Sequence, residues 1–442
     1  MNRHCSESLP SLALSRGGER GYEWVITDFH AHGRAAGAWG IAREQREPLD
    51  WPRGRPLGRC PVAVDMAAEG RYAPPIPMKI CRVSVAPITR IFEKFPQRDF
   101  HLFSRLEKLG HQVLQVKISP SSRPPSPYLS YPIGILQATP KLTSIEPDLI
   151  VADSIEAGVV ASIAALAKRV PLVFDFRDNY SFLHRRDYGY RNLGAVRLLE
   201  RLLPRLADQV IAVDDLRRRF CLQAGVQADR LRLIPNGADS ELFRPGPSDP
   251  GLLAEFGLLG RRVILYSGKI NRSLDLHNVV QAMQEVVLAR PETSLLLVGD
   301  GTALLELKNL SATLGIAKHI VFAGYRPYEE IPGLILASDL CVYPLRSVAA
   351  LSIFEYMACA KPVVVPNADY DLALPEGCCL PVQKTPESFA EGIIRILGDP
   401  MLASRIGTKA REVVEQQFNW DHLAEAYEAA LHDTLKRRGP RR

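Results

Sequence analysis

A single carboxylate, Glu355, stands in a short apolar helical segment, residues 352–358, in the last quarter of the chain. A charged group among apolar side chains is costly unless another group pairs with it. The partner of Glu355 is either a group of its own domain or a hydroxyl of a bound ligand. Taken alone, the residue favours the first interpretation, which is the simpler one.

Two further polar side chains follow short apolar runs that are typical of buried parallel strands. Lys269 comes after the run 263–266, and Asp178 comes after the run 172–174. Ligands of open α/β sheets gather at the carboxyl ends of the strands. Asp178 is therefore a candidate contact for an acceptor substrate. The alternative, a helix N-cap or an ion pair with Arg177, is supported about as well as this acceptor contact.

A basic face is predicted on an amphipathic helix over residues 193–203, in which four leucines lie on the other face. Arg197, Arg201 and Arg205 recur every four residues, so they share one side of the helix. Most basic faces of this kind are only solvated, and a minority rest on anionic lipid head groups. The sequence leaves both interpretations open.

The composition is that of a globular protein with two or three domains. The 442 residues are 46% hydrophobic and 24% charged, and the formal net charge is +6. This weak positive charge suits anionic substrates such as nucleotides, or an anionic membrane surface. We expect no nucleic-acid partner, because no basic binding module is present. The longest apolar run, residues 157–167, is too short to span a bilayer.

The cysteines argue against a metal site. Eight cysteines are scattered along the chain, and none of them forms a C-x-x-C pair. This spacing predicts free thiols in a reducing cytosol and no zinc site. Residues 1–17 lack the apolar core of a secretory signal, so we expect a cytoplasmic protein.

The first 77 residues differ from the rest of the chain. They are rich in arginine, glycine and proline and show little periodicity, which predicts a mostly disordered extension. An apolar run typical of a strand begins at Met78, so Met78 is a candidate for the true first residue of the protein. N-terminal sequencing of the native protein would settle this. From there, strands alternate with helices in two successive parallel α/β units.

A long motif joins the two units. Residues 235–245 spell P-N-G-x-D-x-x-x-F-x-P, and the second unit carries G-K, V-G-D-G, F-x-G-Y, A-S-D-L-x-V-Y-P and F-E-Y-M-A-x-x-K-P-V-V in that order. This series resembles the large retaining glycosyltransferase family of GT-B fold, known as family 4 or "glycosyl transferases group 1". The resemblance extends from Met78 to about Lys436.

The resemblance implies an α/β fold with two Rossmann-like parallel domains that face a cleft. It places an acceptor-side domain at residues 78–245 and a donor-binding domain at residues 246–418. It also implies that a closing helix, residues 419–436, crosses back to the first domain.

The resemblance also implies a function. A retaining, metal-independent hexosyltransferase would move a sugar from a nucleoside diphosphate sugar to a glycan or lipid-linked acceptor, in the synthesis of cell-surface polysaccharide or glycoconjugate. It would need no cofactor beyond this co-substrate. Its expected location is the cytoplasm, with peripheral contact to the inner face of the membrane.

Individual residues match the motifs of the family. The resemblance makes Lys269 and Arg272 the cations that clamp the donor diphosphate. Asp178, a candidate because of its place after a strand, completes the predicted catalytic set. Glu355 matches the last acid of the family's E-x7-E motif, which binds the ribose hydroxyls. Other donor contacts are expected from Gly268, Gly299, Gly324, Tyr325 and Ser347.

Several positions depart from the family pattern. Ser347 stands where the first acid of the E-x7-E motif would fall, and Ser352 stands where many relatives carry a lysine. Ala360 replaces a usual glycine, which predicts a strained turn. Residues 86–90 replace a glycine-rich loop. Two alternatives therefore stay open: a non-catalytic sugar-nucleotide binder that partners an active transferase, and a sugar-nucleotide epimerase of the same fold.

Overall fold

The computed structural model describes residues 76–85, 98–118, 140–189, 193–249, 251–345, 350–366 and 374–438. The predicted disordered extension lies outside the described residues apart from Ile76 and Pro77, and Ser347 and residues 86–90 lie outside them as well. Two six-stranded sheets make up the described fold, and all their strand pairings are parallel. The predicted fold of two parallel α/β units is confirmed.

The first sheet has the strand order β2-β1-β3-β4-β5-β6. Its strands are β1 (Lys79–Val85), β2 (Gln112–Ile118), β3 (Leu149–Ala152), β4 (Leu172–Phe176), β5 (Gln209–Ala212) and β6 (Leu231–Leu233). Its helices are α1 (Arg98–Lys108), α3 (Ile155–Lys168), α4 (Tyr180–Tyr188), α5 (Gly194–Leu206) and α6 (Asp215–Gln223). The central strands are apolar on both faces, because helices cover a parallel sheet from both sides.

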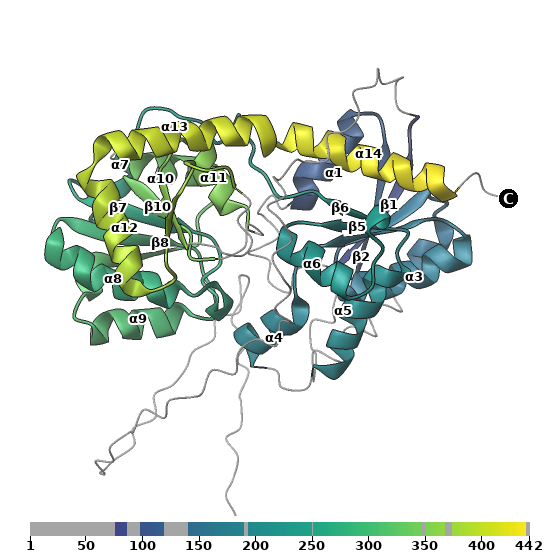
Figure 1. The fold of residues 1–442 in the computed structure, drawn as a ribbon, viewed down its shortest axis with the longest axis horizontal. Coiled ribbons are helices and arrows are strands. Elements are labelled where there is room, and N and C mark those ends of the chain that lie inside the picture. The colour runs from purple at the N-terminus through teal and green to yellow at the C-terminus, as the bar shows by residue number, and fades with distance from the viewer. Residues whose placement is uncertain are drawn as a thin grey trace, which may run out of the picture. The chain divides into compact units, whose positions relative to one another are not determined.

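The C-terminal helix α14 (Trp420–Arg438) packs on this first sheet beside α1 (Figure 1). Trp420 and Tyr427 are fully buried in one core with Ile80 and Leu102. The opposite face of the sheet is covered by α3, α5 and α6. The prediction that the last helix returns to the first domain is confirmed.

The second sheet has the order β12-β11-β10-β7-β8-β9. Its strands are β7 (Arg262–Ser267), β8 (Thr293–Val298), β9 (Ile320–Gly324), β10 (Leu340–Val342), β11 (Val363–Pro366) and β12 (Leu380–Val382). Its helices are α7 (Gly251–Ala254), α8 (Leu276–Ala289), α9 (Leu304–Thr313), α10 (Ile331–Ala337), α11 (Ser352–Ala358), α12 (Pro386–Gly398) and α13 (Pro400–Gln417). One core lies under α10, α11 and α13, and the other under α8 and α12.

Some predicted boundaries were wrong. The helix expected over residues 193–203 continues to Leu206 and contains Pro204 in its last turn. Pro204 has no backbone N–H, so it cannot donate to the carbonyl of Glu200 and removes one hydrogen bond from the last turn of the helix. The apolar runs at residues 207–213 and 340–343 contain shorter strands, Gln209–Ala212 and Leu340–Val342.

Ala360 adopts the left-handed backbone conformation that its replacement of glycine predicted, with φ of 55°. The residue ends the turn after α11, and its carbonyl lies against α13. A Cβ atom built on Gly407 of α13 would lie 2.0 Å from the carbonyl oxygen of Ala360. The turn therefore combines a strained alanine with an obligatory glycine on the facing helix.

We expect Ala360→Gly to stabilise the protein by about 1 kcal/mol, because glycine adopts a positive φ without the steric penalty of a Cβ. Denaturant unfolding measures the change. Gly407→Ala serves as the contrast and should destabilise the protein, because its new Cβ meets backbone. An unchanged or lower stability of Ala360→Gly would show that the turn is not strained.

The described cysteines carry free thiols. Six cysteines lie in the described ranges, and none of these six forms a disulfide. Burial raises the pKa of the Cys81 thiol to about 11, which keeps it protonated at neutral pH. In the same ranges, no helix is both long and apolar enough to cross a membrane.

Candidate functional site

The second sheet has a topological switch point between β7 and β10. From β7 the chain proceeds outward to β8 and β9, and from β10 it proceeds in the opposite direction to β11 and β12. Open α/β sheets bind their ligands in the crevice outside the carboxyl ends of the strands at such a point. Lys269 follows β7 and Glu355 follows β10, so the two candidate residues flank the switch point.

Backbone hydrogen bonds fix the loop that carries Lys269. The amide of Gly268 donates to the carbonyl of Val298 (2.9 Å), and the amide of Ile270 donates to the carbonyl of Asp300 (2.9 Å). The Tyr266 hydroxyl donates to the carbonyl of Lys269 itself, at 2.7 Å. The backbone is therefore held on both sides while the Lys269 residue is exposed to solvent.

Glycines allow the loops after β7, β8 and β9 to lie against one another. Gly268 and Gly299 have φ values of +144° and +136°, and a Cβ on Gly299 would lie 1.8 Å from the carbonyl oxygen of Gly268. The Gly299 amide donates to the carbonyl of Gly324, at 2.8 Å. The structure thus brings the predicted donor residues Gly268, Lys269, Gly299 and Gly324 together, and Tyr325 follows directly.

The partner of the Glu355 carboxylate is Tyr328, at the start of a short 3-10 turn before α10. The Tyr328 hydroxyl donates to Glu355 Oε1 at 3.0 Å. Both residues are buried, with only 5% of Tyr328 and 6% of Glu355 exposed. The predicted need for a partner is thus met within the domain, and sequence spacing did not indicate Tyr328 because 27 residues separate the pair.

Burial raises the pKa of Glu355 to about 7, and the hydrogen bond from Tyr328 opposes part of this shift. The same burial, together with the nearby carboxyl group, raises the pKa of Tyr328. Tyr328 therefore acts as a hydrogen-bond donor throughout the physiological range. Glu355 is poised to lose its proton near neutral pH when a ligand hydroxyl stabilises the charged form.

A second tyrosine, Tyr356, connects α11 to the end of β7. Its hydroxyl accepts a hydrogen bond from the Ser267 amide (2.6 Å) and donates to the Ser267 carbonyl (3.0 Å). Ser267 immediately precedes Gly268 and Lys269. Tyr356 therefore fixes the helix of Glu355 relative to the loop of Lys269, a role that sequence spacing did not indicate.

Arg272 is held by an acid of its own domain. Its Nε donates to Glu306 Oε1 of α9 at 2.7 Å. This contact raises the pKa of the Arg272 guanidinium and lowers that of the Glu306 carboxyl. A diphosphate would have to compete with Glu306 for Arg272, so its clamping role stays a prediction.

Asp178 lies at the carboxyl edge of the first sheet, two residues beyond β4. Its side chain is 44% exposed, and Oδ1 is 3.9 Å from Arg217 Nη2. The alternative partner, Arg177, contacts Asp175 at 3.1 Å and Asp153 at 3.5 Å instead. The exposed carboxylate keeps Asp178 available to an acceptor, and that role also stays a prediction.

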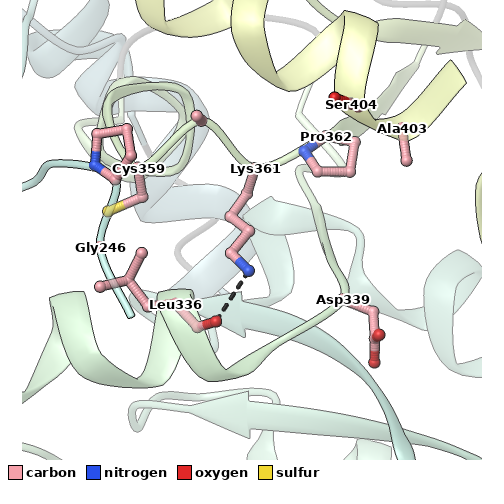
Figure 2. Close-up of a pocket in the computed structure, with 10 residues that line it drawn as sticks. Gly246, Leu336, Asp339, Cys359, Lys361, Pro362, Ala403 and Ser404 are labelled. Carbon is pink, nitrogen blue, oxygen red and sulfur yellow. Dashed lines mark hydrogen bonds between the residues drawn. The ribbon is translucent and has the colours of Figure 1, made fainter. Parts of the chain in front are cut away.

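A pocket of about 290 Å³ lies at the opposite, amino-terminal edge of the second sheet (Figure 2). Asp339 and Lys361 line it, and they precede β10 and β11. Lys361 Nζ donates to the carbonyls of Leu336 (2.8 Å) and Ser338 (2.7 Å). Because Lys361 satisfies carbonyls at the end of α10, its charge stabilises that helix terminus.

Three side chains on the first-sheet side, His111, Glu428 and His432, lie close enough to suggest a metal. The Met78 amide donates to His111 Nδ1 at 3.0 Å, so the neutral ring must carry its proton on Nε2. That Nε2 is 2.6 Å from Glu428 Oε1 and donates to it. A protonated nitrogen cannot bind a metal, so this hydrogen bonding explains the cluster.

Two family descriptions match the chain, one for each half. The description "Glycosyl transferase 4-like domain" matches residues 54–237, and "Glycosyl transferases group 1" matches residues 255–413. The two matches cover the first and second sheets, respectively.

Named relatives agree with these matches. The GDP-mannose-dependent alpha-(1-6)-phosphatidylinositol monomannoside mannosyltransferase of Mycolicibacterium smegmatis is 27% identical over 305 residues, which cover 66% of this chain and 80% of that enzyme. The alpha-D-kanosaminyltransferase of Streptomyces kanamyceticus is 27% identical over 229 residues, which cover 49% of this chain and 58% of that enzyme.

Solved structures show the same fold. The Anabaena protein HepE in complex with UDP and glucose aligns with a TM-score of 0.64 and 23% identity over 80% of this chain and 99% of that one. The sucrose-phosphate synthase of Thermosynechococcus elongatus aligns with a TM-score of 0.69 and 20% identity over 82% of this chain and 100% of that one. Both halves of the chain, their fold and their relatives agree, and the chain belongs to the group 1 glycosyltransferases of GT-B fold.

Proposed function

We propose that this protein is a retaining glycosyltransferase that moves a hexose from a nucleoside diphosphate sugar to a glycan or lipid-linked acceptor. Its expected role is in the synthesis of cell-surface polysaccharide or glycoconjugate. The observation that carries the proposal is the placement of Lys269 and Glu355 on either side of the switch point of the second sheet. This pair provides a cation for a diphosphate and a carboxylate for ribose hydroxyls at one edge.

The chemistry needs a fixed cation. Negative charge builds on the departing nucleoside diphosphate, and a cation held in place stabilises that charge without a metal ion. Lys269 is positioned for this by its hydrogen-bonded loop. The leaving phosphate takes the proton of the acceptor hydroxyl on the same face of the sugar, so the anomeric configuration is retained and no protein base is required.

The donor and acceptor classes rest on the relatives. One relative is named as a GDP-mannose-dependent enzyme that acts on a phosphatidylinositol mannoside, and one structural neighbour was solved with UDP and glucose. These names support a nucleoside diphosphate hexose as donor. The first also supports a lipid-linked acceptor, reached by peripheral contact with the inner face of a membrane, with Asp178 as a contact for the acceptor.

Two observations favour the alternative of a non-catalytic sugar-nucleotide binder. Arg272 is engaged by Glu306, and a serine at position 352 replaces the lysine of many relatives. Such a protein would bind the nucleotide with Glu355 and would release no product. Turnover therefore separates the two functions, whereas nucleotide binding does not.

A donor screen tests the proposal. The purified full chain is mixed with GDP- and UDP-hexoses in the presence of EDTA, and thermal shift, release of nucleoside diphosphate and transfer to a lipid extract are measured. We expect one donor to stabilise the protein and to be turned over. Binding without turnover would support the non-catalytic binder, and interconversion of the free donor sugar would support an epimerase. No binding of any donor would contradict the assignment of Lys269 and Glu355.

A further inference from the structure

Helix α5 presents an apolar and basic face to solvent. Leu198, Leu202 and Leu206 lie at spacings of four residues, and 65%, 39% and 55% of their surfaces are exposed. Each leucine directly follows an arginine, and these arginines are exposed as well: Arg197, Arg201 and Arg205. Because a residue is turned by about 100° from its predecessor, the two sets form adjacent stripes along the helix. We call these six residues the α5 face.

The charge on the α5 face has one sign. Its three arginines form no salt bridge with any residue that the structure describes, although Arg197 interacts electrostatically with Glu200 of the same helix. The helix contains one acid, Glu200, and only 3% of that residue is exposed. Glu200 Oε1 accepts the Ser181 amide at 2.7 Å. The exposed side of α5 thus carries three positive charges and no negative charge.

The neighbouring helix α3 adds exposed apolar side chains. Helices α3 and α5 share one core, and a Cβ on Gly158 of α3 would lie 2.9 Å from the Leu203 side chain of α5. On the solvent side of α3, Ile163 is 64% exposed and Leu166 is 79% exposed. Large apolar groups are therefore uncovered on both of these packed helices.

We propose that the α5 face docks on an anionic lipid surface. Leucines that enter the acyl boundary, beside arginines that bind phosphate head groups, are the combination that holds a helix in the plane of a membrane. Soluble surfaces usually mix charges of both signs and expose few large apolar side chains, whereas the α5 face combines three arginines with three exposed leucines. The proposal gives the suggested transferase a membrane partner, and it can fail or succeed without any effect on nucleotide binding.

Vesicle sedimentation tests the proposal. The full chain is mixed with vesicles of phosphatidylcholine alone and with vesicles that also contain about 30% phosphatidylglycerol, a content at which anionic head groups attract basic residues. We expect binding to the anionic vesicles only. The triple variant R197Q/R201Q/R205Q should bind them on the order of a hundredfold more weakly. The triple variant L198Q/L202Q/L206Q should lose about tenfold or more, because its apolar insertion is removed.

Two matched variants serve as controls. R244Q/K318Q/R405Q removes the same charge from exposed positions elsewhere, and L288Q/L305Q/M401Q removes exposed apolar groups from the second domain. Neither control should change vesicle binding. Circular dichroism and thermal unfolding check that every variant is folded.

Three outcomes would overturn the proposal. The wild-type chain could fail to bind anionic vesicles, or the charge control could weaken binding as much as the α5 variant does. The third outcome is self-association: sedimentation velocity would show a wild-type dimer that the leucine variant dissociates, without vesicle binding. In that case the α5 face would be an interface between two copies of the chain.

Discussion

Lys269→Ala is expected to lower the rate of sugar transfer about a hundredfold, which corresponds to about 3 kcal/mol of transition-state stabilisation. The reason lies in the loop geometry. The Lys269 carbonyl is held by Tyr266, and the residues on either side are bonded to Val298 and Asp300, so the backbone from which the Lys269 side chain extends is fixed. A preplaced cation is most effective when charge develops on the leaving diphosphate.

Steady-state kinetics with the donor found in the screen measure this effect. We expect kcat to fall much more than the affinity for the free nucleoside diphosphate, because the charge is largest in the transition state. Lys318→Ala, at an exposed lysine of the same domain, is the control and should retain full activity. A variant at Lys269 with wild-type kcat would remove this residue from the catalytic site.

The sequence predicted most of the second domain because its local signals agree with the fold. Residues 352–358 form a helix with the predicted bounds, and the apolar runs on either side of it are buried strands. Runs of this kind indicate parallel strands when helices cover both faces of the sheet. The order of the motifs then placed Lys269 and Glu355 at the carboxyl edge.

Other elements had weaker signals. Helix α4 is polar along most of its sequence, so its apolar pattern did not predict a helix. Its start is set by the Asn179 carbonyl, which accepts the Phe182 and Leu183 amides, both at 3.1 Å. Helices α12 and α13 were also missed; they meet at Asp399, whose side chain accepts the Leu402 amide at 2.9 Å. Hydrogen bonds at helix ends define the bounds of these helices, and the residue types alone do not show that such bonds form.

The detail of the candidate site could not be predicted from spacing. Tyr328 and Glu355 are 27 residues apart, and Tyr356 and Ser267 are 89 residues apart. The Tyr356 hydrogen bond exists because β7 and β10 are neighbours in the sheet, and the Tyr328 hydrogen bond joins the segment before α10 to α11, which follows β10. Both depend on the topology of the domain. The sequence identified the carboxylate that needed a partner, and the fold determined which partner it received.

Glu355→Gln is expected to have opposite effects on stability and on function. Burial raises the pKa of Glu355 from 4.5 to about 7 in the folded protein. Below pH 4.5 the carboxyl group is protonated in both states, and its contribution to stability is fully present. Between 4.5 and about 7 only the unfolded chain ionises, so this contribution is lost as the pH rises.

Glutamine keeps an acceptor for the Tyr328 hydroxyl and carries no charge to bury. The variant should therefore be more stable than the wild type by about 3 kcal/mol at pH 8, and the difference should vanish near pH 4. Denaturant unfolding at several pH values measures it. Glu285→Gln, at an exposed position of α8, is the control and should show no such pH-dependent gain.

Nucleotide binding should respond in the other direction. A carboxylate accepts hydrogen bonds from hydroxyl groups more strongly than an amide does, so the variant should bind the nucleoside diphosphate about thirtyfold more weakly at pH 8. Wild-type affinity itself should fall about tenfold per pH unit below 7, because the ligand must then displace a proton. Calorimetry across this range separates the two properties. If the variant is stabilised and still binds nucleotide normally, Glu355 is only a buried structural acid. If the variant is stabilised but loses nucleotide affinity, the wild-type protein keeps a destabilising buried charge because that charge binds ribose.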